Sequence, residues 1–158
     1  MVNTVAELKK IQALQVSKVS NGAVKKTFFT SISIYLLELK NLDVNSCSYI
    51  TDTDLDSIKN LPKLEVLTIN WLYNITASGI CCLQNLKELH SVGCWNLQDN
   101  ALINLLKNSS NLEFLDIRKC RKITSNFVIV SVEVTKQRSS NILLEIYIGG
   151  TICRKIYS

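Results

Sequence analysis

One pattern of apolar residues recurs through the chain at nearly constant spacing. In one-letter form it reads L-x-x-L-x-L-x-x-C-x-x-I-T, and its clearest copy runs from Leu39 to Thr51. Six copies, the first and last of them weaker, begin at Ile11, Leu39, Leu64, Leu86, Leu112 and Leu143. Their mean spacing of about 26 residues is typical of chains that stack one small structural unit on the next. The pattern predicts a single domain over 1–158, with residues 1–10 as a short N-terminal cap or tail.

Within each copy, the apolar residues have the spacing of a strand at first and the spacing of a helix afterwards. The first six positions alternate between apolar and polar residues, as in a short strand with one buried face, so Leu42 and Val44 should point inward together. After the cysteine position the spacing becomes helical, as in Leu55, Ile58 and Leu61. We therefore expect an α/β fold with short parallel strands on one face and helices on the other.

Side chains suited to helix N-termini follow the cysteine position. Candidate caps are Thr51 with Asp54 three residues on, Thr76, Asp99 and Thr124. A further helix is expected between Val24 and Leu39. The segment from Phe127 to Val134 is rich in strand-forming residues, but its place in the repeat predicts a helix.

The cysteines follow the repeat rather than a disulfide or metal pattern. Cys47, Cys94 and Cys120 share one repeat position, where a thiol acts as a small buried hydrophobe. A Cys94–Cys120 bridge stays open geometrically, because the two should lie in adjacent layers. Cys81 and Cys82 are adjacent on a predicted helix, and structural zinc needs four convergent ligands. We expect no metal and no cofactor.

A cysteine that closes the strand, followed shortly by Ile-Thr-Asp, resembles the cysteine-containing subclass of leucine-rich repeats. The closest matches are residues 47–52 and 120–124. The resemblance implies a right-handed horseshoe solenoid of about six repeats, with the strands on the concave face. This subclass is best known from F-box proteins, which recognise substrates for cullin-RING ubiquitin ligases. It also resembles a mitochondrial group related to the ATP synthase coupling factor B.

The chain departs from the F-box proteins in an important respect. An F-box lies before the repeats, and here only residues 1–10 precede the first copy. The chain is then either a repeat-only relative or a partial product. Leu72 replaces the cysteine in one copy, and Ser91 occupies an inward apolar position, so we expect looser packing there.

The segment from Met1 to Gln15 does not read as a signal peptide, because Glu7, Lys9 and Lys10 interrupt its apolar residues. It also does not read as a mitochondrial import sequence, since the first arginine is Arg118. No apolar run reaches the roughly 18 residues of a membrane span. We expect a cytoplasmic or nuclear protein, with a mitochondrial location as the alternative.

The variable positions of the repeat should face a protein partner. With the first leucine counted as position 1, positions 3, 5, 7, 8 and 10 project from the concave face or its rim. The predicted binding residues are Trp71, Tyr73, His90, Trp95, Phe114, Asp116, Arg118, Lys119 and Arg121. Aromatic residues and arginine are enriched in binding hot spots. The alternative is that the large rings simply cover the sheet edge.

Charge is distributed unevenly along the chain. Residues 1–117 carry a net charge of −1 and residues 118–158 one of +6. Arg118, Lys119, Arg121 and Lys122 form a basic cluster suited to an acidic peptide or a phosphate, or else a solvated rim. The positive stretch is too short to indicate nucleic acid.

Two further expectations concern His90 and the N-terminal edge. His90 should lie between Thr68 and Asp116 of the flanking layers, but no nucleophile stands at matching spacing. We expect a polar contact there and no enzyme. The first strand, near Ile11 to Val16, should leave an open edge that permits self-association.

Overall fold

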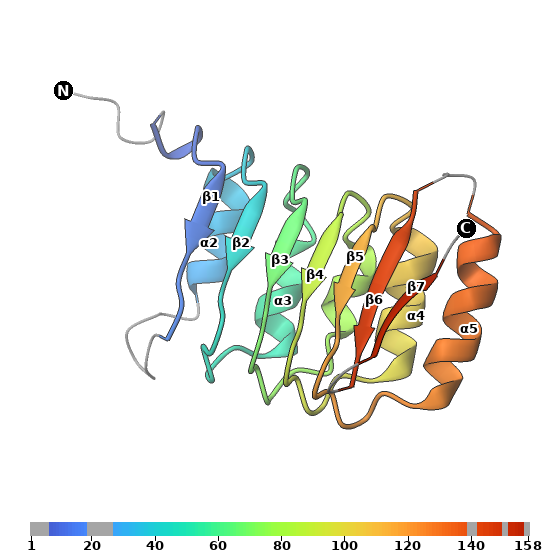
Figure 1. The fold of residues 1–158 in the computed structure, drawn as a ribbon. Helices are drawn as coiled ribbons and strands as arrows, with labels where there is room; N and C mark the ends of the chain where they lie inside the picture. The colour runs from blue at the N-terminus through green and yellow to red at the C-terminus, as the bar shows by residue number, and fades with distance from the viewer. Residues whose placement is uncertain (1–6, 19–26, 139–141, 150–151, 157–158) are drawn as a thin grey trace.

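The computed structural model describes residues 7–18, 27–138, 142–149 and 152–156, the last by its backbone alone. Six short parallel strands follow one another in chain order, and a seventh closes the sheet antiparallel to the sixth (Figure 1). The strands are β1 (Ala13–Gln15), β2 (Asn41–Asp43), β3 (Val66–Thr68), β4 (Glu88–His90), β5 (Phe114–Asp116), β6 (Leu144–Ile148) and β7 (Ile152–Ile156). The expectation of an α/β fold with a parallel sheet is confirmed.

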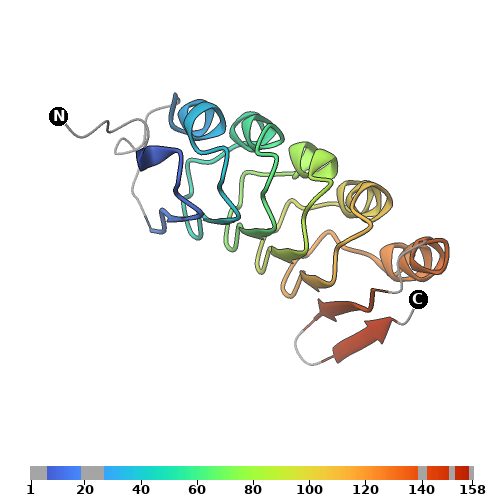
Figure 2. The same cartoon turned by 90° about the horizontal axis from the view of Figure 1, so that it is seen from above.

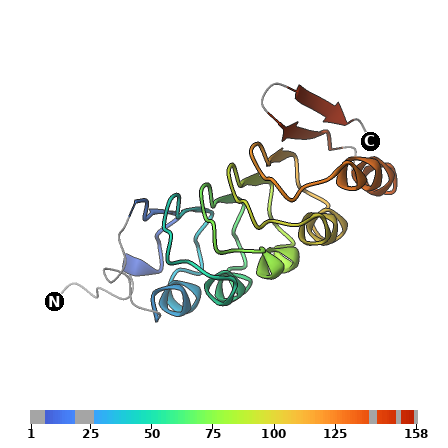
Figure 3. The same ribbon diagram turned by 90° about the horizontal axis from the view of Figure 1, so that it is seen from below.

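Helical segments connect the strands and lie together along one side of the sheet (Figures 2 and 3). They are α2 (Thr27–Tyr35), α3 (Asp52–Ile58), the 3₁₀ helix η1 (Ser78–Cys82), α4 (Asp99–Asn108) and α5 (Ser125–Lys136). The helix predicted over residues 127–134 is confirmed within α5. The predicted helix between Val24 and Leu39 is confirmed over α2, and residues 24–26 lie outside the described residues.

The register of the sheet places equivalent positions of every unit side by side. Position 4 forms one continuous row, which consists of Leu14, Leu42, Leu67, Leu89, Leu115 and Ile146. Five of these six side chains are at most 1% exposed; Leu14, in the first strand, is partly buried. Each layer therefore completes the core of its neighbour, as in repeat proteins.

The ladder continues past the strands into the loops. The Ser46 N–H donates to the Asn70 carbonyl, the Trp71 N–H to Val92 and the Gly93 N–H to Arg118, at 2.8–2.9 Å. This position, the eighth of each unit, has a left-handed backbone in every copy from the first to the fifth, with φ between 58° and 71° at Lys18, Ser46, Trp71, Gly93 and Lys119. The loops are thus held in register as firmly as the strands.

The cysteine position adds a bond between layers. The Cys47 thiol donates to the Val16 carbonyl at 2.8 Å, and the Cys94 and Cys120 thiols donate to Ile69 and Ser91 at 3.0 Å. Burial raises the pKa of Cys94 to about 12 and that of Cys120 to about 11. All three thiols are free, so no Cys94–Cys120 bridge is present. The prediction of buried packing residues is confirmed, with a hydrogen-bonding role added.

The two departures from the repeat are well accommodated. Leu72 and Ser91 are fully buried. The Ser91 hydroxyl donates to the Asp116 carbonyl at 3.1 Å, so burial leaves no unpaired hydroxyl. The expectation of looser packing is not supported at these positions.

The third unit differs from the others because it is short. Only 22 residues separate Leu64 from Leu86, and its helix is the five-residue η1 rather than the α-helix expected there. η1 lies close against α3: a Cβ at Gly79 would be 2.8 Å from the Asp56 backbone nitrogen. Glycine permits this approach.

The Ile-Thr-Asp motif bonds one layer to the next. Asp52 accepts hydrogen bonds from the Thr76 N–H and hydroxyl and from the Ala77 N–H, at 2.7–3.1 Å. Asp99 accepts in the same way from the N–H and hydroxyl of Thr124. At the starts of α3 and α4, the aspartate therefore binds the threonine of the following unit.

Two of the four predicted caps are confirmed. The Asp54 carboxylate accepts from the Thr51 N–H, and the Thr124 hydroxyl accepts from the Asn126 N–H. The predictions for Thr76 and Asp99 are wrong: Ala77 precedes η1 and Gln98 precedes α4 as the capping residue. Their side chains are engaged between layers instead.

Within the described residues, β1 is bonded to β2 alone and begins the sheet. Self-association through this edge stays a prediction.

The aspartate bonds between layers give a testable difference in stability. We predict that Asp52→Ala lowers the free energy of unfolding by about 1–3 kcal/mol, because three donors in the next layer lose their acceptor. Asp56→Ala on the same helix removes only an ion pair with Lys59, both side chains being over 40% exposed, and should cost less than about 1 kcal/mol. Urea denaturation measures both, and equal losses would contradict the layer-bonding role of Asp52.

Candidate functional site

The nine predicted binding residues lie in two groups rather than one. His90, Phe114 and Asp116 belong to strands β4 and β5, on the side of the sheet away from the helices. The others belong to the loops that follow β3, β4 and β5: Trp71, Tyr73, Trp95, Arg118, Lys119 and Arg121. We call the second group, without Arg118, the loop surface.

One row of the loop surface consists of the residues at position 10 of three successive units. The Tyr73 and Trp95 rings lie 4.6 Å apart at 47°, and the Arg121 guanidinium lies 4.3 Å from the centre of the Trp95 ring. Tyr73 and Trp95 are each 38% exposed. Neighbouring strands in a sheet are about 4.8 Å apart, so equivalent side chains stack when the register is exact. The row offers aromatic and cationic surface to solvent.

A second row crosses the same units at position 8. The Trp71 ring lies against Gly93, where a Cβ would be only 2.3 Å from Cε3 of the ring. Lys119 Nζ lies 5.1 Å from the centre of that ring. Gly93 also has a φ of +71°, a left-handed backbone conformation that glycine adopts without strain. Because glycine has no side chain, the Trp71 indole can also lie close to it.

The strand group forms a separate aromatic row. The rings of His90 and Phe114 lie 4.8 Å apart, and those of Phe114 and Tyr147 lie 5.2 Å apart. Tyr147 was missed by the sequence reasoning, which compared only the four central copies. It occupies position 5 of the weak last copy, so extending the comparison to Leu143 would have found it.

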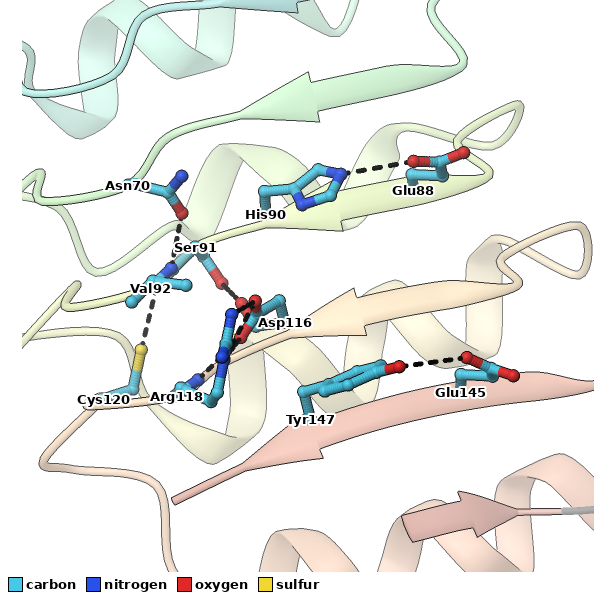
Figure 4. A network of polar contacts seen from close by, with 10 residues as sticks. All are labelled: Asn70, Glu88, His90, Ser91, Val92, Asp116, Arg118, Cys120, Glu145 and Tyr147. Atoms are coloured by element: carbon cyan, nitrogen blue, oxygen red, sulfur yellow. Dashed lines mark hydrogen bonds and ion pairs between the residues drawn. The ribbon is translucent and has the colours of Figure 1, made fainter. Parts of the chain in front are cut away.

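The polar contacts of this row run along each strand (Figure 4). His90 Nε2 is 3.2 Å from Glu88 Oε2. The register places His90 between Thr68 and Asp116, as predicted, but its polar contact is with Glu88, two residues before it on the same strand. The arrangement is a contact between two side chains of one strand, both of them partly exposed.

The position of Asp116 differs from the prediction that this residue faces a partner. Its side chain is buried, the whole residue being 3% exposed, and it accepts from Arg118 Nε at 2.9 Å and from Arg118 Nη2 at 2.6 Å (Figure 4). This bidentate bond raises the pKa of Arg118 above its usual value. Asp116 is thus engaged by its own chain and orients Arg118, rather than facing a partner directly.

The predicted basic cluster is smaller than the sequence indicated. Of its four members, Arg118 is paired with Asp116. Arg138, which lies outside the cluster, donates to the carbonyls of Leu112, Leu106 and Ser109 at 2.8–3.2 Å. Lys119, Arg121 and Lys122 are exposed, and none has an ion pair in the described part of the chain. The available positive charge therefore lies on the loop surface and beside it.

Among the described residues, no group of three or more His, Cys, Asp or Glu side chains is placed to hold a metal ion. No described helix has the length and apolarity needed to cross a membrane.

Comparison with known proteins shows a partial similarity. No protein-family model matches the chain. A protein of Trypanosoma equiperdum described as "Putative adenylate cyclase regulatory protein" is 36% identical over 86 residues. The match covers 53% of this chain and 13% of that protein, so the chain is similar to a small part of a much longer relative.

Replacing Gly93 tests the packing of the loop surface. We predict that Gly93→Ala costs more than Gly149→Ala by about 1–3 kcal/mol of unfolding free energy, because the new methyl group displaces the Trp71 ring. Gly149 has a similar φ of +77° and open space around its Cβ, so Gly149→Ala measures the backbone strain alone. Near-ultraviolet circular dichroism would report the displaced indole.

A double variant tests whether the Trp71 ring causes the extra cost of Gly93→Ala. In a Trp71→Ala background the extra cost of Gly93→Ala should vanish. If the extra cost persists there, the Trp71–Gly93 contact is not its cause.

Proposed function

We propose that this chain is a leucine-rich-repeat solenoid, curved as a right-handed horseshoe, that binds a protein partner. The observation that carries the proposal is the loop surface, where exposed aromatic rings and unpaired cations line up across three layers. Such side chains are the commonest hot spots of protein interfaces. They lie outside the core, so the repeat does not require them for burial.

The charge of this surface indicates the kind of partner segment. Lys119 and Arg121 rest on tryptophan rings, which fixes their positions without neutralising their charge. Lys122 adds a third exposed cation. An acidic segment with an apolar or aromatic anchor would complement the stacked rings and the cations together.

Two more specific functions are compatible with protein binding, and a different observation supports each of them. The cysteine and Ile-Thr-Asp motifs support a substrate-recognition module like that of F-box/leucine-rich-repeat subunits of ubiquitin ligases, acting in the cytoplasm or nucleus. The similarity to the trypanosome protein supports a regulatory module within a signalling protein. Coupling factor B of mitochondria stays the alternative suggested by sequence.

The binding role is tested with a surface variant and a matched control. We predict that Trp95→Ala combined with Arg121→Glu abolishes partner capture, because it removes the centre of the position-10 row and inverts its charge. Ile129→Ala with Lys107→Glu likewise removes one exposed apolar side chain and reverses one positive charge, on the helices, and should leave capture intact. Affinity purification with quantitative mass spectrometry compares the two variants with wild type.

Thermal denaturation of both variants must accompany this comparison. A correctly folded Trp95/Arg121 variant that still captures the same proteins would contradict the proposed surface. The recovered proteins then separate the narrower roles: a cullin and its adaptor support the ligase assignment, a nucleotide cyclase supports the regulatory one, and ATP synthase subunits support the coupling-factor one.

A further inference from the structure

The two adjacent cysteines of η1 have a geometry that packing does not explain. Cys81 Sγ and Cys82 Sγ lie 3.6 Å apart, although a 3₁₀ helix turns about a third of a circle per residue and tends to separate neighbouring side chains. Cys82 is exposed and Cys81 is partly exposed. Both thiols are therefore accessible to a reagent and close enough to react with it together.

A hollow beside Cys82 provides room for such a reagent. It has a volume of about 290 Å³ and lies between the end of α3 and the end of η1. Its lining is formed by Lys59, Leu61, Pro62, Leu64, Cys82, Leu83, Gln84 and Asn85. The Asn85 side-chain amide donates to the Pro62 carbonyl at 2.7 Å, which ties the two walls together.

The other described cysteines lack these properties. Cys47, Cys94 and Cys120 are buried, and each thiol donates to a backbone carbonyl of the preceding layer. The Cys81 thiol also donates to a carbonyl, that of Ser78 at 3.0 Å, but this bond lies within η1 and leaves the thiol partly exposed. Reactive cysteines are exposed and can reach the thiolate form. Cys82 is the more exposed of the two thiols in η1, so Cys82 should react first and Cys81 second.

We propose that Cys81 and Cys82 form a dithiol site that captures a trivalent thiophilic centre, of which a monosubstituted arsenic(III) compound is the representative. In the reaction with phenylarsine oxide, both thiols lose their protons and two S–As bonds form. The arsenic oxygen leaves as water with those two protons. No atom changes its oxidation state, and no further reactant is needed.

The backbone around the site favours this bridged product over a disulfide. A disulfide would bring the sulfurs to about 2.05 Å with a dihedral angle near 90°, which requires rotation of the peptide between two adjacent residues. That peptide is held, because the Asn108 side-chain amide donates to the Cys81 carbonyl at 2.8 Å. A bridging atom spans the existing gap and leaves the backbone in place.

The site is independent of the proposed binding function. η1 is on the helix side of the sheet, whereas the loop surface is formed by the segments that follow the strands (Figure 2). Two thiolates also differ from a structural zinc site, which takes four ligands.

Native mass spectrometry after treatment with equimolar phenylarsine oxide tests the proposal. The parent is Cys153→Ser, because the side chain of Cys153 lies outside the described residues. We expect one phenylarsenic adduct per chain that survives an excess of a monothiol and is removed by a dithiol. Cys81→Ser and Cys82→Ser should each lose the adduct in the monothiol wash, while Cys94→Ala retains it.

Two results would overturn the proposal. One is a parent that retains no adduct after the monothiol wash. The other is a single-serine variant at position 81 or 82 that retains it as fully as the parent. Circular dichroism of every variant confirms that loss of the adduct is not loss of the fold, and a folded Cys81→Ser or Cys82→Ser variant keeps the comparison decisive.

Discussion

The register of the parallel ladder is the constraint on which the rest of the structure depends. Positions 3 to 5 of each unit pair with the same positions of the next, and further backbone hydrogen bonds between the units extend from position 2 to position 8. A shift of one residue would turn the leucines of position 4 toward solvent, because successive side chains of a strand point to opposite faces. The same register that buries the core therefore decides which variable residues become neighbours on the surface.

Several kinds of side-chain hydrogen bond between units reinforce this register at different positions in each unit. The buried thiols bond to the preceding layer, and Asp52 and Asp99 bond to the following one. Asn74 and Asn96 donate to the carbonyls of Ser48 and Tyr73, also one layer back. Since all of these bonds run between units, stability is shared along the stack and no single unit holds its own core.

Most of the architecture followed from the sequence because periodicity records what happens within one unit. The inward positions, the helix at residues 127–134 and the packing role of Cys94 were all predicted from their places in the repeat. The contacts between units were not, since the sequence does not say which side chain of the next layer a carboxylate will reach. Thr76 and Asp99 were for this reason assigned to caps, and the burial of Asp116 was missed.

The structure also differs from the sequence prediction at the C-terminal end of the stack and in its shortest unit. β7 runs antiparallel and carries no copy of the pattern, so no periodicity could predict it. Tyr147 lies in a degenerate copy, where only alignment with position 5 of the other units identifies it. η1 replaces an α-helix because 22 residues leave too little chain for one, which is a limit of length rather than of propensity.

An exact register brings the variable positions of neighbouring units together as one surface. Solution NMR tests it through nuclear Overhauser effects on the side chains of the loop surface. We predict cross-peaks between the Trp71 indole and the Gly93 α-protons, and between the Tyr73 and Trp95 rings, with the Gly93 α-protons shifted by the ring current. A folded protein with an unshifted Gly93 and no cross-peaks between these layers would contradict it.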